Sequence, residues 1–188
     1  MIKFLLASLT IILLSILGCS KPSATPIPAT ATPTPTFEQQ RAAVAGYLRA
    51  LNKIHNDLYQ VNSAISWPST SEYGTAAGLL QLNSGSTQFL TAAQGELKRV
   101  DEVKVPELAE ARAHFQDFRN MLGQGITAVQ KLQAAINAGN PVAIQASFNE
   151  LAALRGQELA VNRFTETLLL KYNIPDAEVD YRFRGILK

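Results

Sequence analysis

The sequence predicts an all-α protein, built as an antiparallel up-down four-helix bundle. Apolar residues recur at alternating gaps of three and four over several long stretches, which is typical of helices that share a buried seam. Short breaks containing Pro or Gly separate these stretches, so a single continuous coiled coil is excluded. Long helices joined by short turns pack most economically as an up-down bundle, which we place at residues 37–174.

The first helix is predicted over 37–65. Thr36 and Gln39 fit a capping box, in which each side chain accepts from the other residue's backbone N–H. The seam then follows with the helical spacing: Val44, Tyr47, Leu51, Ile54, Leu58, Val61 and Ile65. A break at 66–74 ends this helix, and we expect Trp67 to cap the end of the core, with ligand stacking as the alternative.

The second helical region, 75–101, has the least regular apolar stripe. Its members are Leu79, Leu82, Phe89, Ala93, Leu97 and Val100. An Asn-Ser-Gly-Ser-Thr run at 83–87 interrupts the stripe. The region is therefore either one kinked helix or two helices, with Ser86 capping the second.

Two further helices and a tail complete the bundle. Pro106 is a favoured first helical residue, so the third helix is predicted over 106–138. An Ala-Gly-Asn-Pro turn then reverses the chain into a fourth helix over 141–172. The tail, 175–188, is too short to form a sheet alone, so it either lies against the bundle or is mobile.

The N-terminal residues have the pattern of a secretory signal peptide. Lys3 precedes an apolar run over 4–17, which as a helix would reach roughly 21 Å and is too short for a bilayer core of ~30 Å. The run ends in Ile-Leu-Gly-Cys at 16–19, which resembles the lipobox of bacterial lipoproteins. That resemblance implies that a signal peptide of residues 1–18 is removed and that the Cys19 thiol carries lipid.

Residues 19–36 join the lipid-bearing Cys19 to the bundle. This segment is rich in Pro, Thr and Ala without an apolar face, so we expect a disordered spacer that reaches roughly 50 Å. The resemblance implies a lipid anchor in the cell membrane or the outer membrane. The bundle would then face the extracytoplasmic side.

Composition and motifs argue against several functions. Loss of Lys3 from the 17 Lys and Arg leaves 16, against 15 Asp and Glu, so the mature chain is nearly neutral and nucleic acid is not an expected partner. His114 has Glu110 four residues before it and Asp117 three residues after it. This spacing differs from the Glu-x-x-His pairs of di-iron bundles, and we interpret the three residues as a solvated polar face. We therefore expect no metal, no cofactor and no enzymatic activity.

Two functions remain. The first is a structural or protein-interaction module with a protein partner in the envelope. The alternative is a ligand-sensing or ligand-carrying bundle, which resembles in architecture the four-helix extracytoplasmic domains of bacterial receptors. An exposed apolar patch would favour the first function, and an enclosed pocket would favour the second. The oligomeric state is not determined by the sequence.

A polar layer is predicted halfway along the bundle. In a hairpin that reverses near 139–141, Leu122 lies level with Glu158, and the heptad places Glu158 on the seam. A buried carboxylate needs a partner, and Arg155, three residues earlier, is the nearest candidate. Either this pair reaches solvent, or a buried layer fixes the helix register or binds a small polar ligand, with room near Gly125. The candidate ligand-binding residues are His55, Arg155, Glu158 and Asn162.

Overall fold

The computed structural model describes residues 34–182 and 185–186. The predicted signal peptide, Cys19 and most of the linker therefore lie outside the described residues. From Pro35 onward the chain forms one compact unit. Its described elements are all helical: α1 (Phe37–Ala64), η1 (Thr70–Glu72), α2 (Ala76–Asp101), α3 (Ala109–Asn137), α4 (Pro141–Ala153), α5 (Arg155–Lys171) and η2 (Asp176–Glu178).

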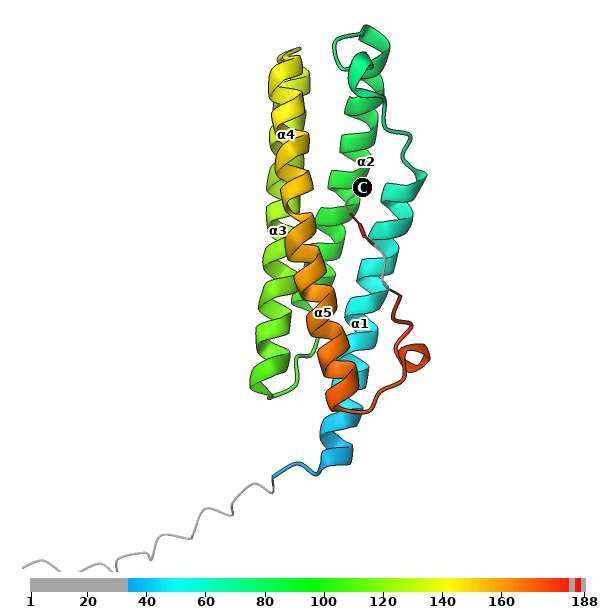
Figure 1. The fold of residues 1–188 in the computed structure, drawn as a ribbon, viewed down its shortest axis with the longest axis vertical. Coiled ribbons are helices and arrows are strands. Elements are labelled where there is room, and N and C mark those ends of the chain that lie inside the picture. The colour runs from blue at the N-terminus through cyan, green and yellow to red at the C-terminus, as the bar shows by residue number, and fades with distance from the viewer. Residues whose placement is uncertain (1–33, 183–184, 187–188) are drawn as a thin grey trace, which may run out of the picture. The chain divides into compact units, whose positions relative to one another are not determined.

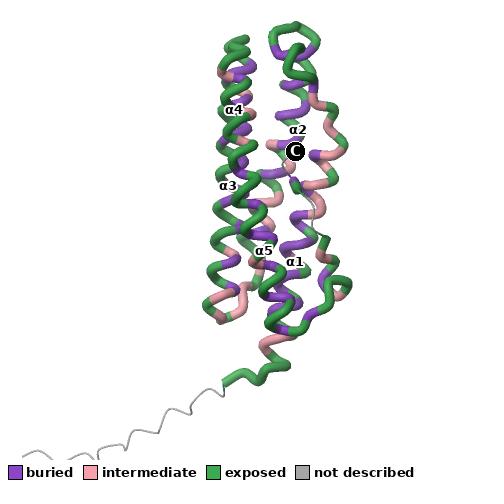
Figure 2. The backbone as a smooth tube through the Cα atoms, in the orientation of Figure 1, coloured by how far each residue is buried: buried purple, intermediate pink, exposed green. Residues whose placement is uncertain are grey.

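The helices form the predicted antiparallel bundle (Figure 1). α1 packs along α2, α2 along α3, and α3 along both α4 and α5, which follow one another as the fourth helical run. The buried residues face the interior of this arrangement, and exposed residues cover its outside (Figure 2). The fold class expected from the apolar periodicity is thus confirmed.

α1 begins with the predicted capping box. The Thr36 hydroxyl accepts from the Gln39 N–H at 3.3 Å, and the Gln39 side chain accepts from the Thr36 N–H at 2.9 Å. These two bonds satisfy backbone donors that a helix start leaves unpaired. The helix ends at Ala64, one residue before the predicted end, because Ile65 adopts an extended backbone.

α2 is one continuous helix through the Asn-Ser-Gly-Ser-Thr run. Gly85 in that run faces the chain that leaves α1, and a Cβ there would lie 2.7 Å from Cγ2 of Ile65 and 3.3 Å from Cζ3 of Trp67. Its missing side chain lets these two residues pack directly on the helix. The small residues are therefore a packing surface, and Ser86 lies inside the helix with its hydroxyl bonded to the Asn83 carbonyl.

α3 begins later than predicted. Pro106 is not its first residue, because the backbone is still extended at Leu108 and the helix starts at Ala109. The side chains of Val103, Val105 and Leu108 pack against the core from this connection. Successive side chains of an extended backbone point to opposite sides. Residues two apart in this short connection can therefore both face the core.

The predicted fourth helix over 141–172 is interrupted at Leu154. The interruption divides it into α4 and α5, yet the N–H of Leu154 still bonds to the Glu150 carbonyl at 3.3 Å, and the Glu158 N–H bonds to the Leu154 carbonyl at 3.0 Å. The break therefore leaves the register of the buried face unchanged. Buried residues keep the helical spacing across it, with the half-buried Leu151 between Ser147 and Leu154: Ile144, Ser147, Leu154, Glu158, Val161, Thr165, Leu168 and Tyr172.

The described part of the C-terminal tail lies against the bundle, which was one of its two predicted arrangements. It runs back along α1 (Figure 1), where Arg41 pairs with Glu178 through two bonds of 3.3 and 2.6 Å. Asn52 donates to the Val179 carbonyl at 3.1 Å. Val179 itself is fully buried. The tail thus adds apolar side chains to the core between α1 and α5.

Candidate functional site: a buried polar layer and an aromatic pocket

The predicted polar layer is present and buried. Glu158 is only 4% exposed and His55 only 6%, and the Nε2 atom of His55 lies 3.4 Å from Oε1 of Glu158. α5 presents Glu158 because it occupies a seam position of the heptad, and α1 presents His55 one residue after the buried Ile54. Of the two predicted alternatives, a solvent-exposed Glu158 is therefore wrong.

The expected partner of Glu158 was also wrong. Arg155 is exposed on the outside of α5, whereas Leu154, one full turn before Glu158, is buried. Because its side chain is exposed, Arg155 lies outside the buried layer. Asn162, the next turn along α5, is buried, and its backbone carbonyl accepts from the Tyr181 hydroxyl at 3.3 Å.

The tail supplies further polar partners for this layer. The Ile186 N–H donates to Oε1 of Glu158, and the Ile186 carbonyl accepts from Nδ2 of Asn62. The Oδ1 atom of Asn62 in turn accepts from the indole N–H of Trp67 at 3.1 Å. A chain of contacts therefore runs from His55 through Glu158, Ile186 and Asn62 to Trp67. Buried polar groups are stable only when paired in this way.

An aromatic pocket of about 340 Å³ lies next to this chain of contacts. Its lining comes from the last turn of α1, the α1–α2 connection, α2, α3 and α4. Tyr73 stacks on Phe148 with ring centroids 5.1 Å apart, and Trp67 meets Phe148 edge-on at 6.0 Å. The lining residues are Asn62, Trp67, Tyr73, Phe89, Val129, Phe148 and Leu151.

Only part of this pocket could be found in the sequence. The sequence predicts a capping or ligand-stacking role for Trp67, but it predicts no contact of Trp67 with Tyr73, Phe89 or Phe148. Trp67 and Tyr73 bracket one short break between helices, which is the only local signal that the two side chains share a site. Their pairing with Phe148 depends on α4 lying beside that break.

The space predicted near Gly125 is small. A cavity of about 20 Å³ is lined in part by Leu122, Gly125 and Glu158, which confirms that these residues lie at one height. Ile186 of the tail also lines it. A cavity of this size holds about one water molecule. The larger volume lies in the aromatic pocket.

His114 is not on a solvated face, contrary to the sequence interpretation. It is only 1% exposed, and it lies between the Tyr47 hydroxyl (2.7 Å from Nδ1) and Thr165 Oγ1 (2.8 Å from Nε2). The Thr165 hydroxyl donates to the Val161 carbonyl at 3.1 Å, so Nε2–H of His114 donates to Thr165. Nδ1 then accepts from the Tyr47 hydroxyl, which also lies 3.2 Å from the Ala111 carbonyl oxygen.

This histidine is a satisfied core residue. Burial lowers the pKa of His114 to about 4, because the charged ring would lose its hydration. Burial likewise raises the pKa of the Tyr47 hydroxyl, so both groups are neutral near pH 7. Glu110, four residues earlier, is bound instead by Lys171 and by the Tyr172 hydroxyl at 2.6 Å. The solvated-face interpretation failed because the seam of α3 includes residue 114.

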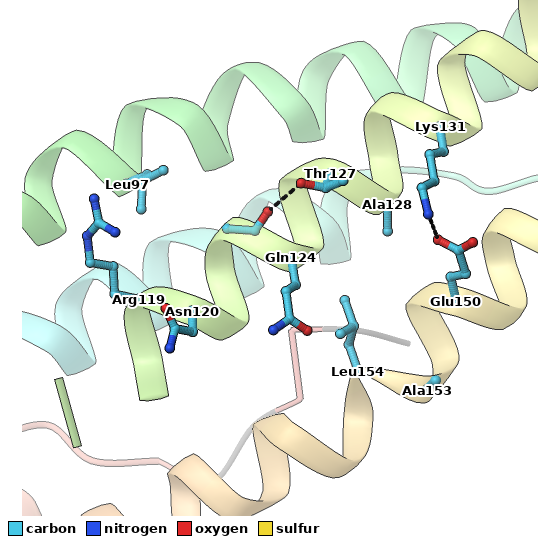
Figure 3. Close-up of a pocket in the computed structure, with 11 residues that line it drawn as sticks. Leu97, Arg119, Asn120, Gln124, Thr127, Ala128, Lys131, Glu150, Ala153 and Leu154 are labelled. Atoms are coloured by element: carbon cyan, nitrogen blue, oxygen red, sulfur yellow. Dashed lines mark hydrogen bonds and ion pairs between the residues drawn. The ribbon is translucent and has the colours of Figure 1, made fainter. Parts of the chain in front are cut away.

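A second, more open groove of about 550 Å³ lies along α3 between α2 and α4 (Figure 3). Several of its polar side chains already bind protein groups. Lys131 pairs with Glu150 at 2.8 Å, the Thr127 hydroxyl donates to the Gly123 carbonyl at 3.0 Å, and Gln124 accepts from Gln157 at 2.9 Å. The groove therefore offers fewer specific contacts to a ligand than its size suggests.

Comparison with protein-family models, with curated proteins and with solved structures found no match for this chain. Within the described ranges, no group of three or more His, Cys, Asp or Glu side chains is placed to hold a metal ion. No helix among the described residues is long and apolar enough to cross a bilayer.

Proposed function

We propose that the chain is a lipid-anchored extracytoplasmic module that binds a small ligand in its aromatic pocket. The observation that carries the ligand-binding part is the pocket of about 340 Å³ bounded by Trp67, Tyr73 and Phe148. Small-molecule sites are concave, mostly apolar and at least about 300 Å³ in volume. The anchoring part rests on the resemblance of residues 16–19 to a lipobox.

The pocket puts ligand binding ahead of a purely structural or protein-interaction role, which the sequence had favoured. Phe89 and Phe148 are held by long helices, whereas Trp67 and Tyr73 come from the connection between α1 and α2. Because two of its walls lie on helices and two lie on a connecting segment, the pocket can admit a ligand without unfolding of the bundle. The protein-interaction role stays a prediction of the sequence alone.

Native mass spectrometry of the full lipidated chain tests ligand binding. The chain is purified in detergent and incubated with an organic extract of the producing cells' envelope. We expect a small-molecule adduct that a pocket-filling Val129→Phe variant lacks, because Val129 lines the pocket. A Leu170→Ala variant, which changes a side chain that is 83% exposed, should retain it. Either identical adducts on the wild-type and Val129→Phe chains, or no adduct on the wild type, would contradict the proposal.

A further inference from the structure

The walls of the aromatic pocket define the shape of a guest. Tyr73 and Phe148 are nearly parallel, with 15° between their ring planes, whereas Trp67 stands at 87° to Phe148. The Trp67 ring therefore forms a corner with the stacked rings of Tyr73 and Phe148. Aromatic rings prefer offset-stacked or edge-to-face neighbours. A flat ring can satisfy both preferences in this corner at once.

The charge of the lining defines the polarity of a guest. None of the seven lining residues carries a formal charge. Asn62 is the only amide among them, and both ends of its side chain are already bonded, Oδ1 to Trp67 and Nδ2 to the Ile186 carbonyl. An ionised guest would lose its hydration there and would have no opposite charge among the lining residues to replace it.

We infer that the aromatic pocket takes a neutral, planar ring compound in preference to an anion or an unbranched alkyl chain. This inference rests on the proposed ligand-binding function and adds the chemical class of the ligand. A volume of about 340 Å³ is near the lower end of small-molecule sites, so the guest is a small ring system.

Trp67 makes the test specific to the pocket, because it is the only tryptophan in the chain. The full lipidated chain in detergent is titrated with N-phenylnaphthylamine, a neutral flat probe, and energy transfer from Trp67 to the probe is measured. Probe dissolved in micelles without bound protein contributes no transfer. Anilinonaphthalene sulfonate has the same rings with one negative charge, and decanol competes as an unbranched chain.

We expect saturable transfer to the neutral probe, weaker binding of the sulfonate and no competition by decanol. Phe148→Leu should weaken binding of the neutral probe roughly two- to tenfold, because it removes one aromatic partner. Leu151→Phe keeps every ring and adds another, so it should reduce binding by filling the pocket even if Phe148→Leu folds poorly. Leu170→Ala is the matched surface control.

Each contrary outcome has a distinct meaning. Equal or tighter binding of the sulfonate, or displacement of the neutral probe by decanol, would overturn the ligand class and leave ligand binding intact. Saturable transfer that neither Phe148→Leu nor Leu151→Phe changes would overturn the pocket as the site. No saturable transfer to either probe, together with no adduct in the mass spectrum, would overturn the proposed function itself.

Discussion

His114 is a buried, neutral residue whose protonation opposes folding. In the unfolded chain its pKa is near the ordinary value of about 6.5, whereas burial lowers it to about 4 in the folded protein. Between these values the unfolded chain binds a proton that the folded chain does not. The contribution of His114 to stability is therefore complete above about pH 6.5 and is lost as the pH falls toward 4.

We expect protonation of the unfolded chain at His114 to lower the free energy of unfolding by about 3 kcal/mol between pH 7 and pH 4. This follows from about 1.4 kcal/mol per pKa unit. Urea unfolding at both pH values measures it in the wild type and in His114→Gln, which cannot titrate. The variant should lose less stability on acidification than the wild type. Gln116→Ala, an exposed change on the same helix that removes no titratable group, should lose as much stability on acidification as the wild type. An equal loss of stability between pH 7 and pH 4 in the wild type and in His114→Gln would show that His114 is accessible to protons in the folded state.

The polar layer shows how one residue can be placed correctly from sequence while its partner is not. Glu158 falls on the seam because its position in the heptad is a local property of α5. Its contacts with His55 and with the Ile186 N–H join parts of the chain far apart in sequence. Arg155 is near Glu158 in the sequence, but its exposed side chain lies outside the buried layer.

At the scale of whole elements, α2 is shaped by what packs on it. Gly weakens a helix by about 1 kcal/mol relative to Ala, yet α2 continues through Gly85 because Ile65 and Trp67 occupy the space of its missing side chain. The gain from this contact outweighs the local preference for a break. α4 and α5 show the same principle, since the seam continues through the interruption at Leu154.

Two glycine substitutions separate helix propensity from packing. Gly85→Ala should destabilise the protein despite its better propensity, because the added Cβ would meet Ile65 at 2.7 Å. It should also shift the emission of the nearby Trp67. Gly123→Ala in α3 has no atom within 4 Å of its added Cβ and should stabilise by up to about 1 kcal/mol. Thermal unfolding of both variants measures the difference, and a stabilising Gly85→Ala would contradict the packing of Trp67 on α2.

At the scale of the whole molecule, the bundle and the proposed anchor are separate parts of one chain. The compact unit begins at Pro35, directly before the Thr36 cap of α1. We therefore expect changes at the lipobox to alter location without altering the stability of the bundle.

Cys19→Ser tests this separation. The chain has one cysteine, so labelled palmitate should be incorporated by the wild type and lost in the variant. Ser20→Ala, a neighbouring change that keeps the thiol, should retain the label. Far-UV circular dichroism should give the same melting temperature for the bundle in all three. Label retained in Cys19→Ser would contradict the lipoprotein interpretation.

The sequence by itself determined the features that depend on neighbouring residues. The capping box at Thr36, the helical class and the seam position of Glu158 all follow from spacings within one turn or one heptad. These patterns act through local geometry, because a helix brings residues three and four apart to the same face wherever it lies.

Only the tertiary structure decided which distant groups meet. It placed His114 between Tyr47 and Thr165, filled the polar layer with the tail, and joined Phe148 to Trp67 in one pocket. None of these contacts has a local signature, since each depends on the height and rotation of two separate elements. Their pairing is decided by the packing of the whole core, where close-packed side chains leave few alternative arrangements.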